Sequence, residues 1–88
     1  MIVAITGSSA GVGRATAREF AAQGWDVALI ARNRPRLDDA ANEVRQHGVR
    51  ALAVEADVGD YALLQAAAVR IERELGPIDV WINNAMAT

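Results

Sequence analysis

The chain has 88 residues, 52% of them hydrophobic, and a formal net charge of −2 at pH 7. This length allows one domain at most, and the hydrophobic content predicts a folded core. No basic cluster suggests a nucleic-acid or anionic-membrane partner, and no run approaches the ~20 apolar residues of a membrane span. Cysteine is absent, which excludes disulfides and thiolate metal sites and is compatible with the cytoplasmic location that we expect.

Four short apolar runs are each predicted to form a buried strand, because they are bounded by glycine or polar turns and their cores are apolar on both faces. In chain order, these predicted strands are 2–5, 27–30, 51–54 and 78–82. Helical segments separate them, giving the order β-α-β-α-β-α-β. Strands that alternate with helices predict right-handed crossovers and a parallel sheet covered on both faces. The expected fold is therefore a three-layer α/β fold.

The first helix is predicted over 12–23, directly after a glycine-rich turn. Ala15, Phe20 and Ala21 are available for its buried face, and Gly24 is a suitable C-terminal stop. Abundant alanine favours helix formation and close packing of helices on a sheet.

The second predicted helix begins after Asn33, a good N-cap, and ends at Gly48. Its apolar stripe comprises Leu37, Ala40, Ala41 and Val44. The third helix is capped by either Asp57 or Asp60 and ends at Gly76. Its stripe comprises Leu64, Ala67, Ala68, Ile71 and Leu75. These spacings place the apolar side chains of each helix on one face.

The turn after the first strand, TGSSAGVG over residues 6–13, has features of a phosphate site. One glycine permits a sharp turn, one lets the backbone approach a pyrophosphate, and one lets the helix pack closely on the sheet. Ser8 and Ser9 can add hydroxyl hydrogen bonds to phosphate, and the helix start offers N–H groups and partial positive charge. A plain glycine-rich turn is the alternative, but its place between a buried strand and a helix favours phosphate binding.

The G-x-x-x-G-x-G spacing of this turn resembles the cofactor loop of the short-chain dehydrogenases/reductases. Asp-Val at 57–58 resembles the adenine-contacting pair of that family, and Asn-Asn-Ala at 83–85 resembles its Asn-Asn-Ala-Gly motif, whose glycine is replaced here by Met86. The resemblance implies a partial Rossmann-like, dinucleotide-binding domain over 1–88, truncated after the fourth strand. The implied cofactor-binding residues are Gly7, Ser8, Ser9, Gly11, Val12, Gly13, Arg32, Asp57, Val58, Asn83 and Ala85.

The residues after the second strand favour NADP(H) over NAD(H). An NAD site usually has an acidic residue there to accept from the ribose 2′-OH, whereas this chain continues Ala-Arg-Asn-Arg over 31–34, with no carboxylate until Asp38. Arginine binds phosphate bidentately. Arg32 is the first candidate for the 2′-phosphate, Arg34 the second and Arg14 the third. The alternative is that these arginines are solvated loop charges.

The resemblance also implies roles at the other two motifs. Asp57 would accept from the adenine amino group, in competition with helix capping, while the next residue packs beside the ring. Asn83 and Ala85 would offer backbone atoms to the adenosine ribose. Asn84 and Thr6 are expected to be structural.

Catalysis in the resembled family depends on a Tyr-x-x-x-Lys motif that this chain lacks. It has no lysine, and its only tyrosine, Tyr61, is followed four residues later by Gln65. We therefore expect no catalytic residue and no metal site here, and hydride transfer between nicotinamide and a carbonyl or alcohol belongs to a parent enzyme. Two alternatives stay open: a stand-alone nucleotide-binding module, or a half-domain whose exposed fourth strand pairs with a second copy or a complementing chain.

Overall fold

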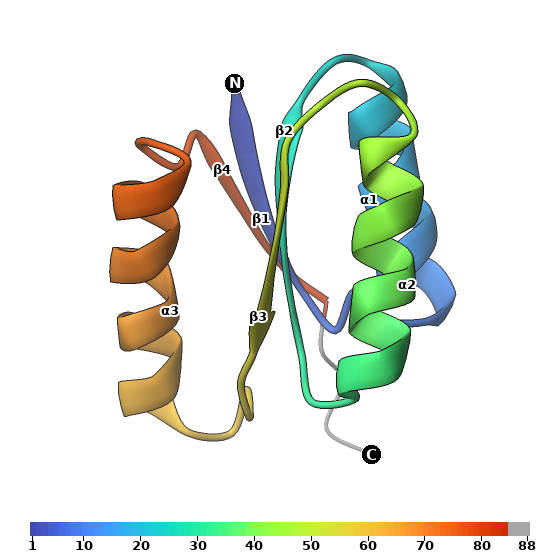
Figure 1. The fold of residues 1–88 in the computed structure, drawn as a ribbon. Helices are drawn as coiled ribbons and strands as arrows, with labels where there is room; N and C mark the ends of the chain where they lie inside the picture. The colour runs from blue at the N-terminus through green and yellow to red at the C-terminus, as the bar shows by residue number, and fades with distance from the viewer. Residues whose placement is uncertain (85–88) are drawn as a thin grey trace.

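The computed structural model describes residues 1–84, which form one four-stranded parallel sheet with helices on both faces (Figure 1). The strands are β1 (Ile2–Thr6), β2 (Asp26–Ala31), β3 (Ala51–Glu55) and β4 (Val80–Asn83). The helices are α1 (Gly11–Ala22), α2 (Arg34–Arg45) and α3 (Tyr61–Glu74). This alternation confirms the predicted α/β fold. Every helix in this part of the chain is too short or too polar to cross a bilayer.

The strand order is β3-β2-β1-β4, and each neighbouring pair is parallel. The chain builds outward from β1 through β2 to β3 and then crosses to the other side of β1 to form β4. The direction of winding therefore reverses between β1 and β4. Because all four strands are parallel, their C-terminal ends lie at one edge of the sheet. In sheets of this kind, ligands bind at that edge, at the point of reversal.

The larger core cluster lies between the sheet and the two helices α1 and α2, which cover the same face (Figure 1). All four residues of the predicted α2 stripe are buried, as expected. On α1 the buried residues are Gly13, Ala17 and Ala21. Ala15, predicted for this buried face, is exposed instead, because positions four apart repeat on one side of a helix and residue 15 falls outside that series.

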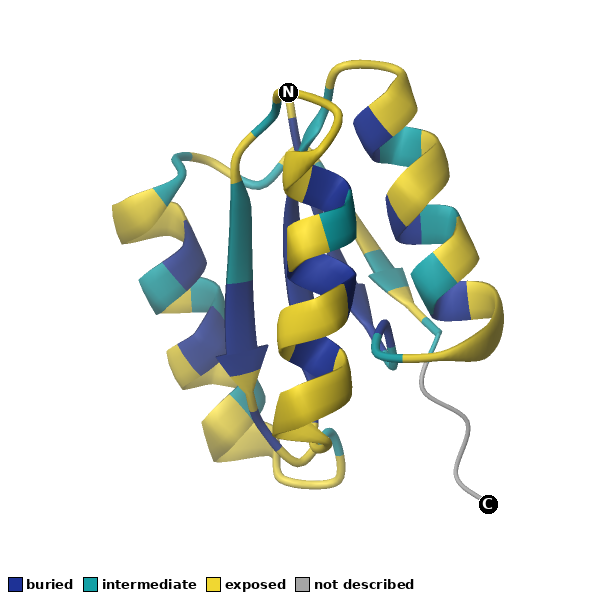
Figure 2. Ribbon diagram, turned by 45° about the vertical axis from the view of Figure 1, so that its right-hand side comes forward, coloured by how far each residue is buried: buried dark blue, intermediate teal, exposed yellow. Residues whose placement is uncertain are grey.

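The second core cluster lies under α3 on the opposite face of the sheet. Ala67 and Ile71 are buried, whereas the remaining predicted stripe residues of α3 are only partly buried. Figure 2 shows the buried residues concentrated in the central strands and on the sheet-facing sides of the helices. The three layers are thus joined by two separate apolar interfaces.

The capping residues of α2 and α3 are defined by side-chain hydrogen bonds. Asn33 Oδ1 accepts from the Arg36 N–H at 3.0 Å, which confirms Asn33 as the N-cap of α2. Asp60 Oδ1 accepts from the Leu63 N–H at 3.2 Å and so caps α3. Of the two alternatives predicted for α3, the structure therefore selects Asp60, which leaves Asp57 without a capping role.

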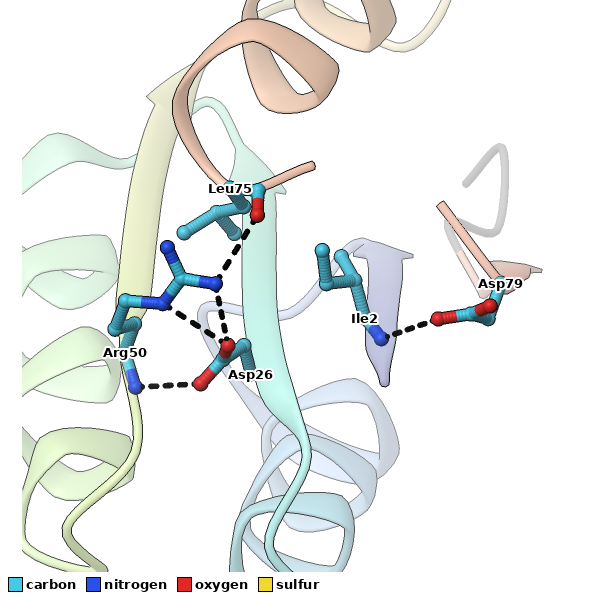
Figure 3. Close-up of polar contacts among 5 residues, drawn as sticks. All are labelled: Ile2, Asp26, Arg50, Leu75 and Asp79. Atoms are coloured by element: carbon cyan, nitrogen blue, oxygen red, sulfur yellow. Dashed lines mark hydrogen bonds and ion pairs between the residues drawn. The ribbon is translucent and has the colours of Figure 1, made fainter. Parts of the chain in front are cut away.

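The fourth strand begins at Val80, two residues later than predicted. Before it, Asp79 contacts the start of β1 through side chain and backbone: its Oδ2 accepts from the Ile2 N–H at 2.7 Å, and its own N–H donates to the Ile2 carbonyl at 2.9 Å (Figure 3). A carboxylate thus takes the place of a ladder hydrogen bond at this point, which shortens the regular strand.

A second polar contact joins the start of β2 to the residue before β3 (Figure 3). The Arg50 backbone N–H donates to Asp26 Oδ1 at 2.8 Å, and its guanidinium donates to Oδ2 at 2.8 Å and 3.0 Å. The same guanidinium donates to the Leu75 carbonyl at 3.0 Å, which ties the end of α3 to the sheet. Partial burial raises the pKa of Asp26, but the hydrogen bonds and charge of Arg50 outweigh it, so the pKa is lowered overall.

Candidate functional site

The glycine-rich turn between β1 and α1 lies at the C-terminal edge of the sheet. Gly7 and Gly11 have φ of 65° and 61°, in the left-handed region that favours glycine. The Gly7 N–H donates to the Ile30 carbonyl at 2.9 Å, which fastens the turn to β2. A Cβ added at Gly11 would meet no atom within 4 Å. The turn therefore leaves open space beside its second glycine.

Gly13 allows close packing of α1 against this turn. A Cβ at this position would lie 2.2 Å from the Gly7 carbonyl oxygen and 2.7 Å from Asn84 Nδ2. Real Cβ atoms do not approach backbone oxygen so closely, so only glycine fits without displacement of the turn. The structure thus has a sharp turn at Gly7 and close packing at Gly13, as expected, while the approach of a pyrophosphate to Gly11 stays a prediction.

Ser8 and Ser9 differ in their surroundings. Ser8 is fully buried, and its Oγ donates to the Ile5 carbonyl at 2.9 Å and accepts from the Ile30 N–H at 3.1 Å. Its hydroxyl thus joins β1 to β2 and is not directed to a phosphate, contrary to the role suggested by the sequence. Ser9 is partly exposed, and no hydrogen bond of its hydroxyl occurs within residues 1–84. Of the two serines, only Ser9 therefore has a hydroxyl that is available for the predicted contact with phosphate.

The residue that directly precedes α1 has no side chain that could cap the helix. Ala10 is the N-cap, in extended conformation, and the first turn of α1 contains no acidic residue. By contrast, α2 and α3 are capped by Asn33 and Asp60. Val12, also assigned to the site, is exposed in this first turn. The start of α1 thus presents backbone N–H groups that no side chain of the described residues caps, with the partial positive charge of the helix dipole.

Thr6 connects the ends of β1 and β4. Its buried hydroxyl donates to Asn83 Oδ1 at 2.8 Å and accepts from the Asn84 N–H at 3.0 Å. The expectation that Thr6 and Asn84 are structural is confirmed. The side chain of Asn83 is engaged with Thr6, so only its backbone atoms remain for the ribose contact that was predicted. Ala85 and Met86 lie outside the described residues.

The basic residues differ in whether their charge is already paired. Six of the nine arginines have a hydrogen-bonded side chain: Arg14, Arg18, Arg34, Arg45, Arg50 and Arg70. The guanidinium groups of Arg32, Arg36 and Arg73 have no such partner within residues 1–84. Arg32 directly follows β2 and is exposed at the C-terminal edge of the sheet.

The other two arginines considered for the 2′-phosphate are held by acidic residues. Arg34 pairs with Asp38, four residues later on α2, at 3.2 Å. Arg14 Nε donates to Glu43 Oε1 at 2.9 Å, across the interface between α1 and α2. Sequence reasoning did not single out Glu43, and no local signal could have done so, because the two residues are 29 positions apart. Of the three candidates, Arg32 alone has a guanidinium without a partner among residues 1–84.

The loop between β3 and α3 holds the second predicted motif. Asp57 is exposed, and its Oδ1 accepts from the Gly59 N–H at 2.9 Å, which closes a short turn. The other carboxylate oxygen of Asp57 makes no hydrogen bond or ion pair within the described residues. Val58 is partly buried against the core cluster under α3. Tyr61 is exposed, and its hydroxyl accepts from Gln65 Nε2 at 2.8 Å.

No group of three or more potential metal-binding side chains occurs among residues 1–84. The arrangement consists instead of a glycine-rich turn and an uncapped helix at the switch point of a parallel sheet. An arginine without a partner in this part of the chain, Arg32, follows the neighbouring strand. These features define a Rossmann-like nucleotide-binding class of domain.

Comparison with known proteins identifies the family within that class. Residues 1–88 match the family described as short chain dehydrogenase, and the chain belongs to that family. It is 40% identical to 2,3-dihydro-2,3-dihydroxybenzoate dehydrogenase of Bacillus subtilis over 96% of its own length and 32% of that protein. It is 38% identical to gluconate 5-dehydrogenase of Gluconobacter oxydans, covering 92% of this chain and 32% of that one.

Solved structures agree with this assignment. L-sorbose reductase from Gluconobacter frateurii, complexed with NADPH and L-sorbose, superposes with a TM-score of 0.92 at 37% identity, over 98% of this chain and 33% of the reductase. NAD⁺-bound xylitol dehydrogenase superposes with a TM-score of 0.94 at 32% identity, over 98% and 33%. The chain thus spans about a third or less of the length of the relatives that it matches.

Proposed function

We propose that residues 1–88 form the NADP(H)-binding domain of a short-chain dehydrogenase/reductase-type oxidoreductase that acts in the cytoplasm. The parent enzyme would transfer hydride between the nicotinamide and a carbonyl or alcohol substrate. Similarity to an NADPH-bound reductase and an NAD⁺-bound dehydrogenase supports a nicotinamide dinucleotide as ligand. The pyrophosphate would lie against the glycine-rich turn, beside Gly11 and the start of α1.

The proposal that the domain binds NADP(H) in preference to NAD(H) rests on Arg32. It follows β2 at the position where an NAD site usually has a carboxylate, and its guanidinium has no partner within residues 1–84. The two bound relatives do not favour either cofactor, since they are about equally similar to this chain. An arginine that is free and exposed there can bind the 2′-phosphate bidentately, whereas NAD(H) offers it only a hydroxyl.

Asp57 and Asn83 supply the adenosine end of the proposed site. The free oxygen of Asp57 is available for the adenine amino group, because Asp60 and not Asp57 caps α3. The backbone of Asn83 lies at the end of β4, next to the glycine-rich turn across Thr6. The contacts of Val58 with the ring and of Ala85 with the ribose are part of the same proposal. No catalytic group is assigned to this chain.

Titration with NADPH and NADH at one ionic strength tests this proposal. We expect wild-type protein to bind NADPH more tightly than NADH. Arg32→Ala should weaken NADPH by about 1–3 kcal/mol, the usual size of a lost charge-assisted hydrogen bond, and should leave NADH nearly unchanged.

Arg73→Ala is the matched control, because Arg73 also has no partner in the described part of the chain but lies in the last turn of α3. It removes the same charge at a position outside the proposed site. Equal losses for both nucleotides in Arg32→Ala would contradict the 2′-phosphate contact, and binding of neither nucleotide by wild-type protein would contradict the proposed site.

A second candidate is a half-domain that binds another polypeptide through β4. Within residues 1–84, β4 pairs only with β1, so its other side is an open edge. Trp81 on this strand is 38% exposed, unusual for a large aromatic in a sheet of this kind. Light scattering would show a mass of one chain if β4 stays unpaired. A dimer that Trp81→Lys dissociates would favour pairing with a second copy.

A further inference from the structure

An ion pair links α2 to the backbone of the glycine-rich turn. Arg14 Nε donates to Glu43 Oε1 at 2.9 Å, and Nη1 of the same guanidinium donates to the Ser9 carbonyl oxygen at 3.3 Å. Arg18 approaches the same Glu43 oxygen at 3.4 Å. Contacts therefore run without interruption from α2, through the Arg14 side chain, to the peptide group that follows Ser9.

This pair is more enclosed than the ion pairs formed within single helices. The Arg14 and Glu43 side chains are 23% and 33% exposed, against 49% and 51% for Arg34 and Asp38. The hydrogen bond from Arg14 lowers the pKa of Glu43, despite partial burial, and the same bond raises the pKa of Arg14. Both groups are therefore charged at neutral pH, and a charge-assisted bond with restricted water access is stronger than one on the open surface.

The Ser9 carbonyl matters because it belongs to the peptide just before α1. A trans peptide is planar, so a bond that holds the Ser9 C=O also fixes the direction of the Ala10 N–H. Ala10 is the N-cap of α1, and no side chain caps that helix among the described residues. The Arg14 contact thus orients the turn at the position where a side-chain cap is missing.

The structure assigns Arg14 and Glu43 a positioning role: Glu43 holds Arg14, and Arg14 holds the turn between β1 and α1 in the conformation that receives the pyrophosphate. This inference rests on the proposed nucleotide site. Since NADPH and NADH share the pyrophosphate, the pair sets affinity for both equally, whereas Arg32 distinguishes them. Arg14, the third candidate for the 2′-phosphate, is on this view a support for the turn and touches no cofactor.

Glu43→Ala tests the role when compared with Glu74→Ala. Each removes one carboxylate from an ion pair, but Glu74 pairs with Arg70 on α3, across the sheet from α2. We expect Glu43→Ala to weaken NADPH and NADH by the same factor, roughly threefold to tenfold, and Glu74→Ala to change neither. Glu43→Gln keeps an acceptor for Arg14 and should retain most of the affinity. In the Arg14→Ala background, Glu43→Ala should have no further effect.

Hydrogen exchange of the backbone amides tests the same contact without any nucleotide. Amides of residues 14–17, the first hydrogen-bonded amides of α1, should exchange faster in Glu43→Ala than in wild type, while those of β3 stay unchanged, and Glu74→Ala should match wild type over 14–17. Equal exchange in the two variants would overturn the positioning role, whether or not nucleotide binds. Tighter NADPH binding by Glu43→Ala would also overturn it, because Arg14 would then be a phosphate ligand that Glu43 restrains. Faster exchange in Glu43→Ala, together with no nucleotide binding by wild-type protein, would support the positioning role of Arg14 and Glu43 and would contradict only the proposed function.

Discussion

At the edge where the strands begin, charged side chains join neighbouring elements: Asp79 binds the backbone of Ile2, and Asp26 binds Arg50, which in turn reaches Leu75 (Figure 3). At the opposite edge, where the strands end, the backbone is shaped largely by glycine. Gly13 permits contact between α1 and the turn, and Arg32 has no partner within the residues that the structure describes.

This difference between the two edges of the sheet shows which of them is available for binding a ligand. Charges that are paired with each other contribute to folding but have less to offer a ligand, whereas free N–H groups and an unpaired guanidinium can bind an anion. The N-terminal edge therefore serves stability. The C-terminal edge also contains paired side chains, but within residues 1–84 it keeps the N–H groups at the start of α1 and the Arg32 guanidinium for the proposed nucleotide. Substitutions at the two edges should separate these two properties.

The largest expected effect is at Gly13. Gly13→Ala places a Cβ where the Gly7 carbonyl oxygen already lies, so the turn or α1 must shift. We expect a loss of about 3 kcal/mol in the free energy of unfolding, at the upper end of overpacking costs, measured by urea denaturation. Gly11→Ala is the control: it meets no atom but must adopt a positive φ, which costs about 1–2 kcal/mol. A milder effect at Gly13 than at Gly11 would show that the turn can move aside.

Ser8→Ala should reduce stability more than it reduces nucleotide affinity measured on the folded protein. It removes the acceptor of the buried Ile30 N–H and the donor to the Ile5 carbonyl. A buried hydrogen bond contributes about 0.5–1.5 kcal/mol, so the loss of both should cost about 1–3 kcal/mol, which chemical denaturation would detect. Ser9→Ala, at a partly exposed position, should leave stability nearly unchanged. If the two variants had the opposite pattern, the hydroxyl of Ser8 would belong to the ligand site after all.

Asp26→Asn tests the N-terminal edge. It keeps the shape of the side chain but removes the charge that Arg50 contacts, so we expect a loss of about 1–2 kcal/mol at pH 7. Affinity for nucleotide, measured on the folded protein, should not change, because the substitution lies at the edge away from the proposed site. A loss of affinity comparable with that of Arg32→Ala would remove the distinction between the two edges.

The same variant should change how stability depends on acid pH. The pKa of Asp26 is lower in the folded protein than in the unfolded chain, so its contribution is present above the unfolded value of about 4 and is lost as pH falls through the folded pKa. The pKa of Glu43 is lowered too and adds to this loss. Thermal unfolding between pH 7 and pH 3 should therefore show a smaller decline for Asp26→Asn than for wild type.

The smallest effect on stability is expected at Arg32. Its guanidinium makes no hydrogen bond or ion pair with a described residue, so Arg32→Ala should shift the free energy of unfolding by less than about 0.5 kcal/mol. Arg50→Ala removes the contacts to Asp26 and Leu75 and should cost more. Differential scanning calorimetry of the two variants compares the edges directly, and an equal loss would mean that Arg32 is structural.

The local pattern of residue types along the sequence was sufficient to predict most of the fold. The alternation of apolar runs with helical segments predicted all seven elements, and Gly7, Gly11 and Gly13 were recognised because their roles follow from their spacing along the chain. Errors arose where the pattern was incomplete. The residue type of Ala15 favours a buried face, but the structure leaves it exposed. The apolar Ile78 favours an earlier start of β4, but Asp79 interrupts the ladder.

The β-α order, the glycine-rich turn and the arginine after β2 follow from the sequence alone, since each depends on residues that are close along the chain. The pairing of side chains that are far apart along the chain depends instead on three-dimensional packing. This packing placed Ser8 between β1 and β2, gave the capping of α3 to Asp60, and brought Glu43 to Arg14. Hydrogen-bonding groups such as these have several available partners in the unfolded chain, and packing of the three layers leaves each with the one that lies within reach.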